Sequence, residues 1–165
     1  MNEQTIQELL DEVKRQEETL TFNHFDPDTA WLLGKLLYDK AKDLNKPVTI
    51  DITVAGQQLF HVALPRTTPD NDEWIKRKNR VVNRFHKSSF RLGQELKLKG
   101  RTMEENYLVS SFEYAAHGGA FPLTIKGVGV IGTITISGLP QVEDHQMVVE
   151  GIQEYLAIYE PEWIN

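Results

Sequence analysis

The sequence predicts an α+β fold in which helices pack on an antiparallel β-sheet. This class is predicted by apolar residues at helical spacing near both chain ends, an alternating β-hairpin before the midpoint and two β-branched strands late in the chain. The predicted elements follow the order α, β, α, β, β, α, β, β, α. Because 165 residues suffice to bury a core, we expect residues 1–165 to form one domain with an N-terminal helix at 1–19.

The first half of the chain contains two predicted helices, a short strand and a hairpin. Residues 3–18 carry an apolar stripe at helical spacing, formed by Ile6, Leu9, Leu10 and Val13. A short strand at 20–22 precedes Asp26-Pro27, which offers an N-cap and a first-turn proline for a helix through Leu44. Strands at 48–54 and 58–64 then alternate with a period of two around Gly56, which predicts a β-hairpin.

The second half begins with a long predicted helix at 73–97, closed by Gly100. A short helix at 103–108, strands at 121–125 and 128–137 and a last helix at 142–159 follow. The apolar stripe of the long helix consists of Ile75, Val82, Phe85, Leu92 and Leu96, and Lys78 falls on the same stripe. A lysine there must reach an edge of the core, pair with an acid or face an anionic group of a ligand.

Residues 127–132 read GVGVIG, which matches the G-x-G-x-x-G pattern of dinucleotide-binding loops. That pattern binds a pyrophosphate where its glycines open a helix. Here the β-branched run TITIS follows, and the next predicted helix begins only after Gly138-Leu139-Pro140. We therefore predict that these glycines form a turn and allow close approach of another backbone or a ligand to a strand.

The composition excludes several classes of protein. The chain has no cysteine, which rules out disulfides, thiolate catalysis, cysteine-ligated zinc and iron–sulfur clusters. The net charge is −6, yet residues 76–101 contain ten basic residues and one acid. Nucleic acid is not an expected partner, since no helix-turn-helix pattern, stacking aromatic set or zinc motif accompanies this basic segment. No signal peptide or membrane span is predicted, and we expect a cytoplasmic protein.

The candidate site residues lie in two loops and on the long predicted helix. His117 precedes Gly118-Gly119, a pair that either exposes backbone amides to an anion or forms a sharp turn into a strand. The five histidines show no metal-ligand spacing, so no metal site is predicted. Asp144 enters the last helix, where an acid interacts favourably with the helix dipole. Loop ends can bring Asp144 and His117 into one site.

Three segments carry a resemblance to a known family: WIKRKNRVVNRFHKSS, AAHGGAFPL and GVIGTITISGLPQVEDHQMVVEGI. Together they resemble the haem-degrading-domain superfamily of GlcG-like proteins, over about residues 20–158, and within it a subgroup of uncharacterised small proteins. The features that match are Lys78, Gly118, Gly119, Pro122, Gly132, Ser137, Gly138 and Asp144. The resemblance implies a profilin-like sheet with helices packed on it and assembly into homo-oligomers. Some relatives bind haem or are associated with tetrapyrrole handling.

These observations lead to two hypotheses about function. The first is a small-ligand-binding homo-oligomer whose site contains Lys78, His117, Gly118, Gly119, Pro122 and Asp144, with no defined reaction. Haem or a related tetrapyrrole is its candidate ligand, with His117 meeting the iron and Lys78 a propionate. The second is an assembly or adaptor protein that acts through its helical surfaces without a small ligand. Trp74 and Trp163 are candidate apolar anchors of an oligomer interface.

Overall fold

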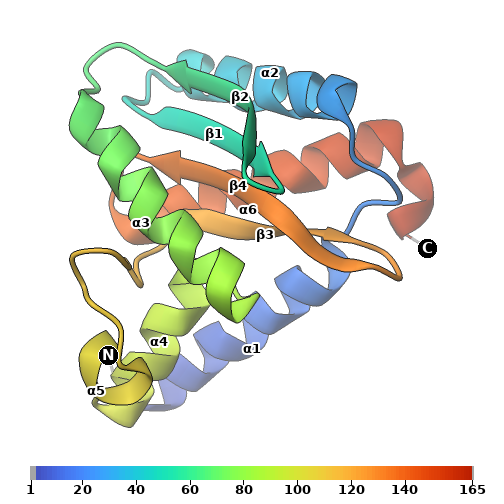
Figure 1. Cartoon of the computed structure of the whole chain (residues 1–165). Helices are drawn as coiled ribbons and strands as arrows, with labels where there is room; N and C mark the ends of the chain where they lie inside the picture. The colour runs from blue at the N-terminus through green and yellow to red at the C-terminus, as the bar shows by residue number, and fades with distance from the viewer. Residues whose placement is uncertain (1–2, 165) are drawn as a thin grey trace.

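The computed structural model describes residues 3–164 and confirms the α+β class (Figure 1). Its four strands form one antiparallel sheet in the order β2-β1-β4-β3. The strands are β1 (Thr49–Val54), β2 (Gln57–Ala63), β3 (Ala120–Ile125) and β4 (Gly129–Ser137). The helices are α1 (Glu3–Thr19), α2 (Pro27–Asp43), α3 (Pro69–Phe85), α4 (Ser89–Lys99), α5 (Met103–Tyr107) and α6 (Gln141–Tyr159), and a 3-10 helix, η1, covers Pro161–Ile164.

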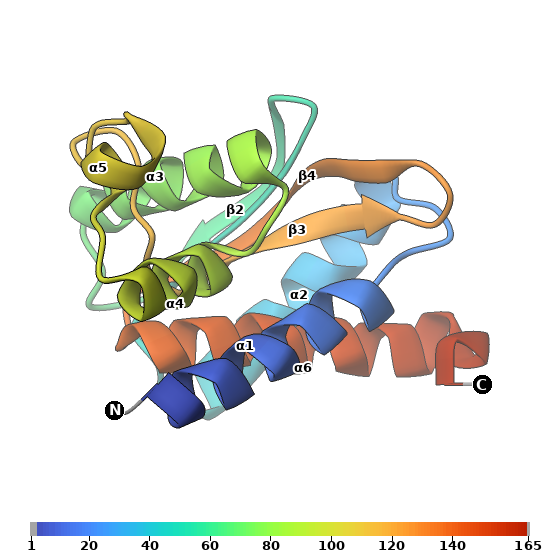
Figure 2. The same cartoon turned by 90° about the horizontal axis from the view of Figure 1, so that it is seen from below.

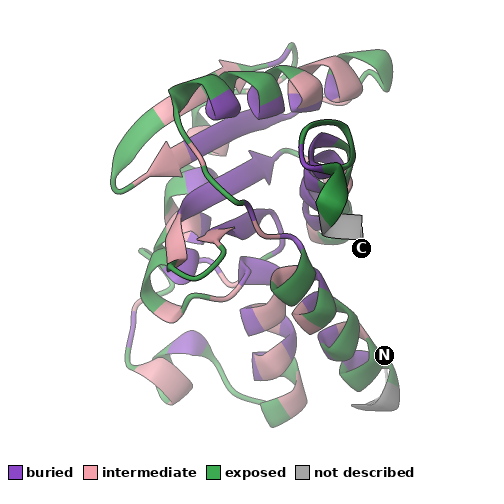
Figure 3. Ribbon diagram, turned by 90° about the vertical axis from the view of Figure 1, so that its right-hand side faces the viewer, coloured by how far each residue is buried: buried purple, intermediate pink, exposed green. Residues whose placement is uncertain are grey.

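The two faces of the sheet differ because side chains alternate along each strand. Figure 1 shows α3 crossing one face, while α2 and α6 cover the other. Isoleucines on the α2 and α6 side form the main apolar core with these helices, and they are Ile50, Ile52, Ile134 and Ile136. The side under α3 carries buried polar residues, namely Thr49, Asp51, Thr133, Thr135 and Ser137. Figure 3 shows the buried strands between the helices.

One α3 side chain ties the two central strands together on the polar face. The Asn79 amide donates to Asp51 of β1 over 3.3 Å and accepts from the hydroxyl of Thr135 in β4. Asp51 and Thr135 lie directly opposite each other in the β1–β4 pairing. Asp51 also accepts from Thr53 and Gln58, at 2.8 and 2.7 Å, so this buried carboxylate has its hydrogen bonds satisfied.

The predicted helix at 73–97 is wrong as a single element. The chain leaves α3 at His86, which adopts the left-handed conformation with φ 55°, and α4 begins three residues later. Ser88 caps α4 by accepting from the Arg91 amide over 3.1 Å. The apolar periodicity continues across this break because both helices bury one side, which explains the error. Gly100 ends α4 as predicted, with φ 65°.

Two other predictions are modified. The strand expected at 20–22 is only a single bridge between Phe22 and Ile125. The glycines of the GVGVIG segment lie in the β3–β4 hairpin, where Gly127 and Gly129 have φ of 76° and 120°. A Cβ on Gly132 would lie 2.1 Å from the Thr53 carbonyl oxygen, so this glycine allows β1 and β4 to approach. Within residues 3–164, no helix is long and apolar enough to cross a membrane.

Helix α1 packs beside α4 and α6 through polar contacts as well as its apolar stripe (Figure 2). Glu17 pairs with Arg91 of α4 at 3.0 Å. His145 of α6 is 4% exposed, stacks on Phe90 with ring centroids 4.7 Å apart and contacts Gln16 through Nε2 at 2.8 Å. Its Nδ1 has no hydrogen-bond partner among the described residues. Burial lowers the pKa of His145 to about 4, so the imidazole is neutral in the folded protein at pH 7.

Candidate functional site

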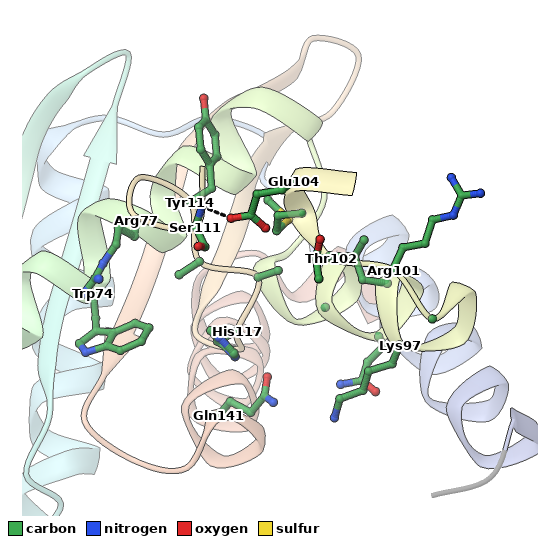
Figure 4. A pocket seen from close by; sticks show the side chains of 17 residues that line it. Trp74, Arg77, Lys97, Arg101, Thr102, Glu104, Ser111, Tyr114, His117 and Gln141 are labelled. Carbon is green, nitrogen blue, oxygen red and sulfur yellow. Dashed lines mark hydrogen bonds between the residues drawn. The ribbon is translucent and has the colours of Figure 1, made fainter. Parts of the chain in front are cut away.

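Two adjoining cavities share a wall formed by Trp74, His117 and Gln141. The larger has a volume of about 710 Å³ and lies between α3, α4, α5 and the loop that leads to β3 (Figure 4). The smaller has a volume of about 320 Å³ and lies between α3, the end of β4 and the start of α6. Cavities of roughly 300–1,000 Å³ are typical of small-molecule sites. The shared wall therefore places His117 in contact with both candidate sites.

His117 is held in place by a hydrogen bond of its neighbour Gly118 and by a contact of its own ring. The Gly118 amide donates to the Gln141 side-chain oxygen over 3.0 Å. The imidazole meets the Trp74 ring edge-to-face at a centroid distance of 5.9 Å, and the Arg77 guanidinium lies 4.3 Å from the same indole. A Cβ on Gly118 would lie 2.2 Å from the Gln141 carbonyl oxygen, so only glycine allows this approach. The loop thus presents His117 at a fixed place.

The His117 imidazole is free to act as a ligand. No described residue hydrogen bonds to its ring nitrogens. Its pKa is lowered by partial burial against the cavity walls and by the positive charges of Lys78 and Lys97. The ring is therefore neutral at pH 7, with one nitrogen lone pair available. In the described part of the chain, no group of three or more His, Cys, Asp or Glu side chains is placed to hold a metal ion.

The larger cavity combines a thioether and aromatic rings with positively charged side chains. Its titratable walls include three basic residues, Arg77, Lys97 and Arg101, and one acid, Glu104. Glu104 accepts the Ser111 amide over 2.8 Å, and this hydrogen bonding lowers the pKa of its carboxyl group. Met103 and Tyr114 add a thioether and a phenol. The net charge of the walls therefore favours a ligand with an apolar body and anionic groups.

The smaller cavity is built on a buried ion pair. Lys78 and Asp144 are 4% and 1% exposed, and Lys78 Nζ lies 3.1 Å from Asp144 Oδ2. Of the alternatives for Lys78, the structure shows pairing with an acid. Asp144 also accepts the Leu139 and Gly138 amides, at 2.9 and 3.3 Å. The prediction that it acts as a first-turn helix charge is thus incomplete, because the carboxylate bonds the preceding loop and a lysine.

Burial shifts the pKa values of Lys78 and Asp144 in opposite directions. It lowers the pKa of Lys78, against the attraction of Asp144, because the ammonium is removed from water. It raises the pKa of Asp144, against the attraction of Lys78 and the amide hydrogen bonds, for the same reason. Desolvation can exceed the Coulombic gain of a buried pair. Both shifts reduce the free-energy difference between the charged pair and the neutral pair.

The remaining predicted residues lie next to the site without lining either cavity. Gly119 has φ 140°, and a Cβ there would lie 2.3 Å from the Ile136 carbonyl oxygen and 2.8 Å from Lys78 Nζ. This glycine therefore leaves the space that the ammonium fills. Pro122 pairs with Thr133 inside β3 and lines neither cavity. The structure thus brings Lys78, His117 and Asp144 to one cavity and leaves Pro122 outside it.

Sequence reasoning missed part of the shared wall. Trp74, a candidate interface anchor, is half-buried and meets the His117 ring edge-to-face. Its spacing to Arg77 and Lys78 on α3, at i+3 and i+4, places all three on one side of the helix and is the signal that was available. Gln141 begins α6 without any distinguishing pattern. The other candidate anchor, the side chain of Trp163, lies outside the described residues.

Comparisons with known proteins show the family and the fold of the chain. The model of a family described as haem degrading protein HbpS-like matches residues 25–153. A UPF0303 protein of Streptomyces coelicolor is 52% identical over 145 residues, covering 88% of this chain and 92% of the relative. The crystal structure of the Ybr137w protein has a TM-score of 0.84 and 34% identity, covering 90% and 88% of the two chains. A PduOC–haem complex has the same fold, with a TM-score of 0.61 and 20% identity, covering 73% and 87%.

Proposed function

Because the chain belongs to the HbpS-like family of haem degrading proteins, we propose that it binds haem or a related tetrapyrrole in the 710 Å³ cavity. The observation that carries the proposal is the neutral, unpartnered imidazole of His117 on the wall of that cavity, among the described residues. A single histidine suffices as a protein ligand of haem iron, whereas a protein-held metal ion needs several ligands. The PduOC–haem complex supports the choice of ligand.

Each wall of the larger cavity then has a role. His117 binds the iron, and Trp74 holds the imidazole edge-to-face. The side chains of Arg77 and Lys97 pair with the propionates, since Lys78 lines only the smaller cavity. A bound haem supplies ligand-binding or electron-transfer chemistry at its iron, and this chain's residues bind and orient it. The family alone assigns no reaction to these residues.

The smaller cavity supports His117 in this proposal. The Lys78–Asp144 pair and the Asp144 hydrogen bonds to the loop fix the start of α6. The first residue of α6, Gln141, in turn accepts the amide of Gly118 beside the imidazole. Gly118 and Gly119 provide the close backbone approach, and Pro122 continues their turn into β3. In this proposal Lys78, His117 and Asp144 line the cavities, Gly118, Gly119 and Pro122 support them from outside, and His117 alone touches the iron.

Haemin titration tests the proposal. We expect a saturable shift of the Soret band, and about tenfold or more weaker binding in His117→Ala. The exposed His24, which lines neither cavity, provides the control variant His24→Ala. Because the pKa of His117 is lowered, binding should persist below the usual histidine pKa of about 6.5 and weaken on further acidification. The absence of a saturable shift, or an equal effect of both variants, would exclude this role of His117.

We further propose that the chain forms a closed homo-oligomer. Leu108 and Phe112 are 90% and 89% exposed and lie four residues apart in the segment after α5, where a second copy would cover them. We expect sedimentation velocity to show the same oligomer at low salt and at 1 M salt, because apolar burial is not screened. Leu108→Ser/Phe112→Ser should shift the protein to smaller species, whereas Val128→Ser, also exposed, should not. A monomer at both salt concentrations would contradict the proposal.

Native mass spectrometry tests the adaptor hypothesis against the ligand-binding hypothesis. Native mass spectrometry of the protein purified from cells should show a retained small molecule if the cavities are ligand sites. A co-purifying protein with empty cavities would favour an adaptor instead. Leu108 and Phe112 are the observation that favours this alternative, since exposed apolar residues also bind other proteins.

A further inference from the structure

The ammonium of Lys78 keeps one donor free in the smaller cavity. Its Nζ lies 3.1 Å from Asp144 Oδ2 and 3.5 Å from the Ile136 carbonyl oxygen. An ammonium group has three N–H donors, so the third has no acceptor among the described residues. Lys78 nevertheless lines the 320 Å³ cavity. A buried lysine with a free donor at a cavity wall is placed to meet a ligand.

A second polar group faces the same cavity without a partner. Ser137 is 3% exposed and lines the cavity, and no described residue hydrogen bonds to its hydroxyl group. Its backbone oxygen accepts from Asn71, at 3.4 Å, so the strand end is fixed while the hydroxyl stays available. The Ser137 hydroxyl is therefore available to a ligand atom that donates or accepts a hydrogen bond.

The chemistry of the pair indicates what Lys78 does there. Burial brings the pKa values of Lys78 and Asp144 towards each other, and the two groups are within hydrogen-bond distance. A proton can therefore pass from the ammonium to the carboxylate, which leaves a neutral amine in contact with the cavity. Lysine amines made nucleophilic by desolvation condense with carbonyl compounds.

We propose that Lys78 forms a reversible imine with a small aldehyde or ketone bound in the 320 Å³ cavity, and that Asp144 carries the proton. Asp144 first accepts a proton from the ammonium, and the Nζ lone pair then forms a bond to the carbonyl carbon. Asp144 returns the proton to the carbonyl oxygen, which leaves as water after a second proton moves from nitrogen to oxygen. The products are a protonated imine, the Asp144 carboxylate and one water molecule, with no oxidant or reductant required.

The walls of the cavity define the class of ligand. Its volume is at the lower end of the roughly 300–1,000 Å³ of small-molecule sites, which restricts the ligand to a small molecule. The positive charge of Lys78 is cancelled by Asp144, and Asp70 adds a negative charge to the wall. An uncharged carbonyl compound is therefore favoured over an oxo acid. The site does not rest on haem binding, because the two ligands occupy different cavities.

Reductive trapping tests the proposal on the full chain. The protein is incubated with glycolaldehyde and cyanoborohydride near neutral pH, and the modified lysines are mapped by peptide mass spectrometry. We expect Lys78 to be labelled at least about fivefold faster than Lys76, an exposed lysine on the same helix. Glyoxylate, which carries a carboxylate, should label Lys78 more slowly than glycolaldehyde. Labelling of Lys78 no faster than Lys76 would overturn the proposal.

The pH profile separates a reactive amine from a merely buried one. Asp144 is the charged group in hydrogen-bond contact with Lys78, and His117 and Asp70 line the same cavity. We expect the labelling rate of Lys78 to level off at a lower pH than that of Lys76. A lysine protected only by burial would react more slowly than Lys76 at every pH, which would contradict the proposal.

In Ser137→Ala, which retains the ion pair, labelling of Lys78 should slow about threefold or more, by loss of one hydrogen bond to the bound carbonyl.

Discussion

Replacing Asp144 with alanine is expected to lower the free energy of unfolding by about 3–5 kcal/mol, because it leaves the Lys78 ammonium buried without its counter-charge. Only the Ile136 carbonyl oxygen, 3.5 Å away, would remain as an acceptor for that ammonium among the described residues. The Leu139 and Gly138 amides would lose their acceptor at the same time. Chemical denaturation of the purified variants measures the loss.

Two further variants identify the cause. Lys78→Met/Asp144→Asn removes both charges and keeps an amide oxygen for the Leu139 amide, so it should recover much of the stability. Glu143→Ala changes a neighbouring acid whose side chain is 52% exposed and 3.8 Å from Lys46. It should cost about 0–1 kcal/mol. If Asp144→Ala were as mild as Glu143→Ala, the burial of the pair would not be the source of its effect.

Acidification is expected to destabilise the protein through His145. The pKa of this imidazole is about 4 in the folded protein, against about 6.5 in the unfolded chain. Between these values the unfolded chain binds a proton that the folded protein does not bind, so stability rises with pH. His145 therefore contributes fully above about pH 6.5, and about 3 kcal/mol is lost as the pH falls to about 4.

A variant without the imidazole isolates this effect. His145→Gln keeps a polar side chain near Gln16 but cannot titrate in this range, so its stability should depend less on pH between 6.5 and 4. The exposed His86, at the end of α3, provides the matched control His86→Gln, whose pH dependence should follow that of the wild type. Unfolding free energies at several pH values give the slopes. An unchanged slope in His145→Gln would mean that the imidazole is protonated in the folded state.

Local patterns predicted most of the fold because each depends on neighbours along the chain. The alternation of β1 and β4, the Asp26 cap of α2 and the glycine that ends α4 are all signals within a few residues. The break between α3 and α4 was missed because it leaves the apolar periodicity intact. It depends on the left-handed conformation of His86, a residue that does not mark a helix end by its type.

The site was predictable only where a residue conflicts with its local pattern. Lys78 stood out because a lysine on an apolar stripe needs a partner. Its partner is 66 positions away, and no pattern along the chain distinguishes Asp144 from the neighbouring Glu143 for that contact. Trp74 and Gln141 fit their helices without conflict, so their place in the shared wall follows from tertiary packing alone.

The contact that Asn79 makes with both central strands has a consequence for how the chain folds. Each of the two hairpins, β1–β2 and β3–β4, closes between neighbouring segments, whereas β1 and β4 meet across more than seventy residues. Such long-range pairing forms slowly, because the chain loses the entropy of closing a large loop before the stabilising contacts form. A slip of one residue would turn the isoleucines of β4 towards α3 and move Thr135 away from Asp51. The Asn79 side chain can bond both Asp51 and Thr135 only when these two residues lie opposite each other. Helix α3 therefore favours the correct register of β1 and β4 at the step where the two hairpins join.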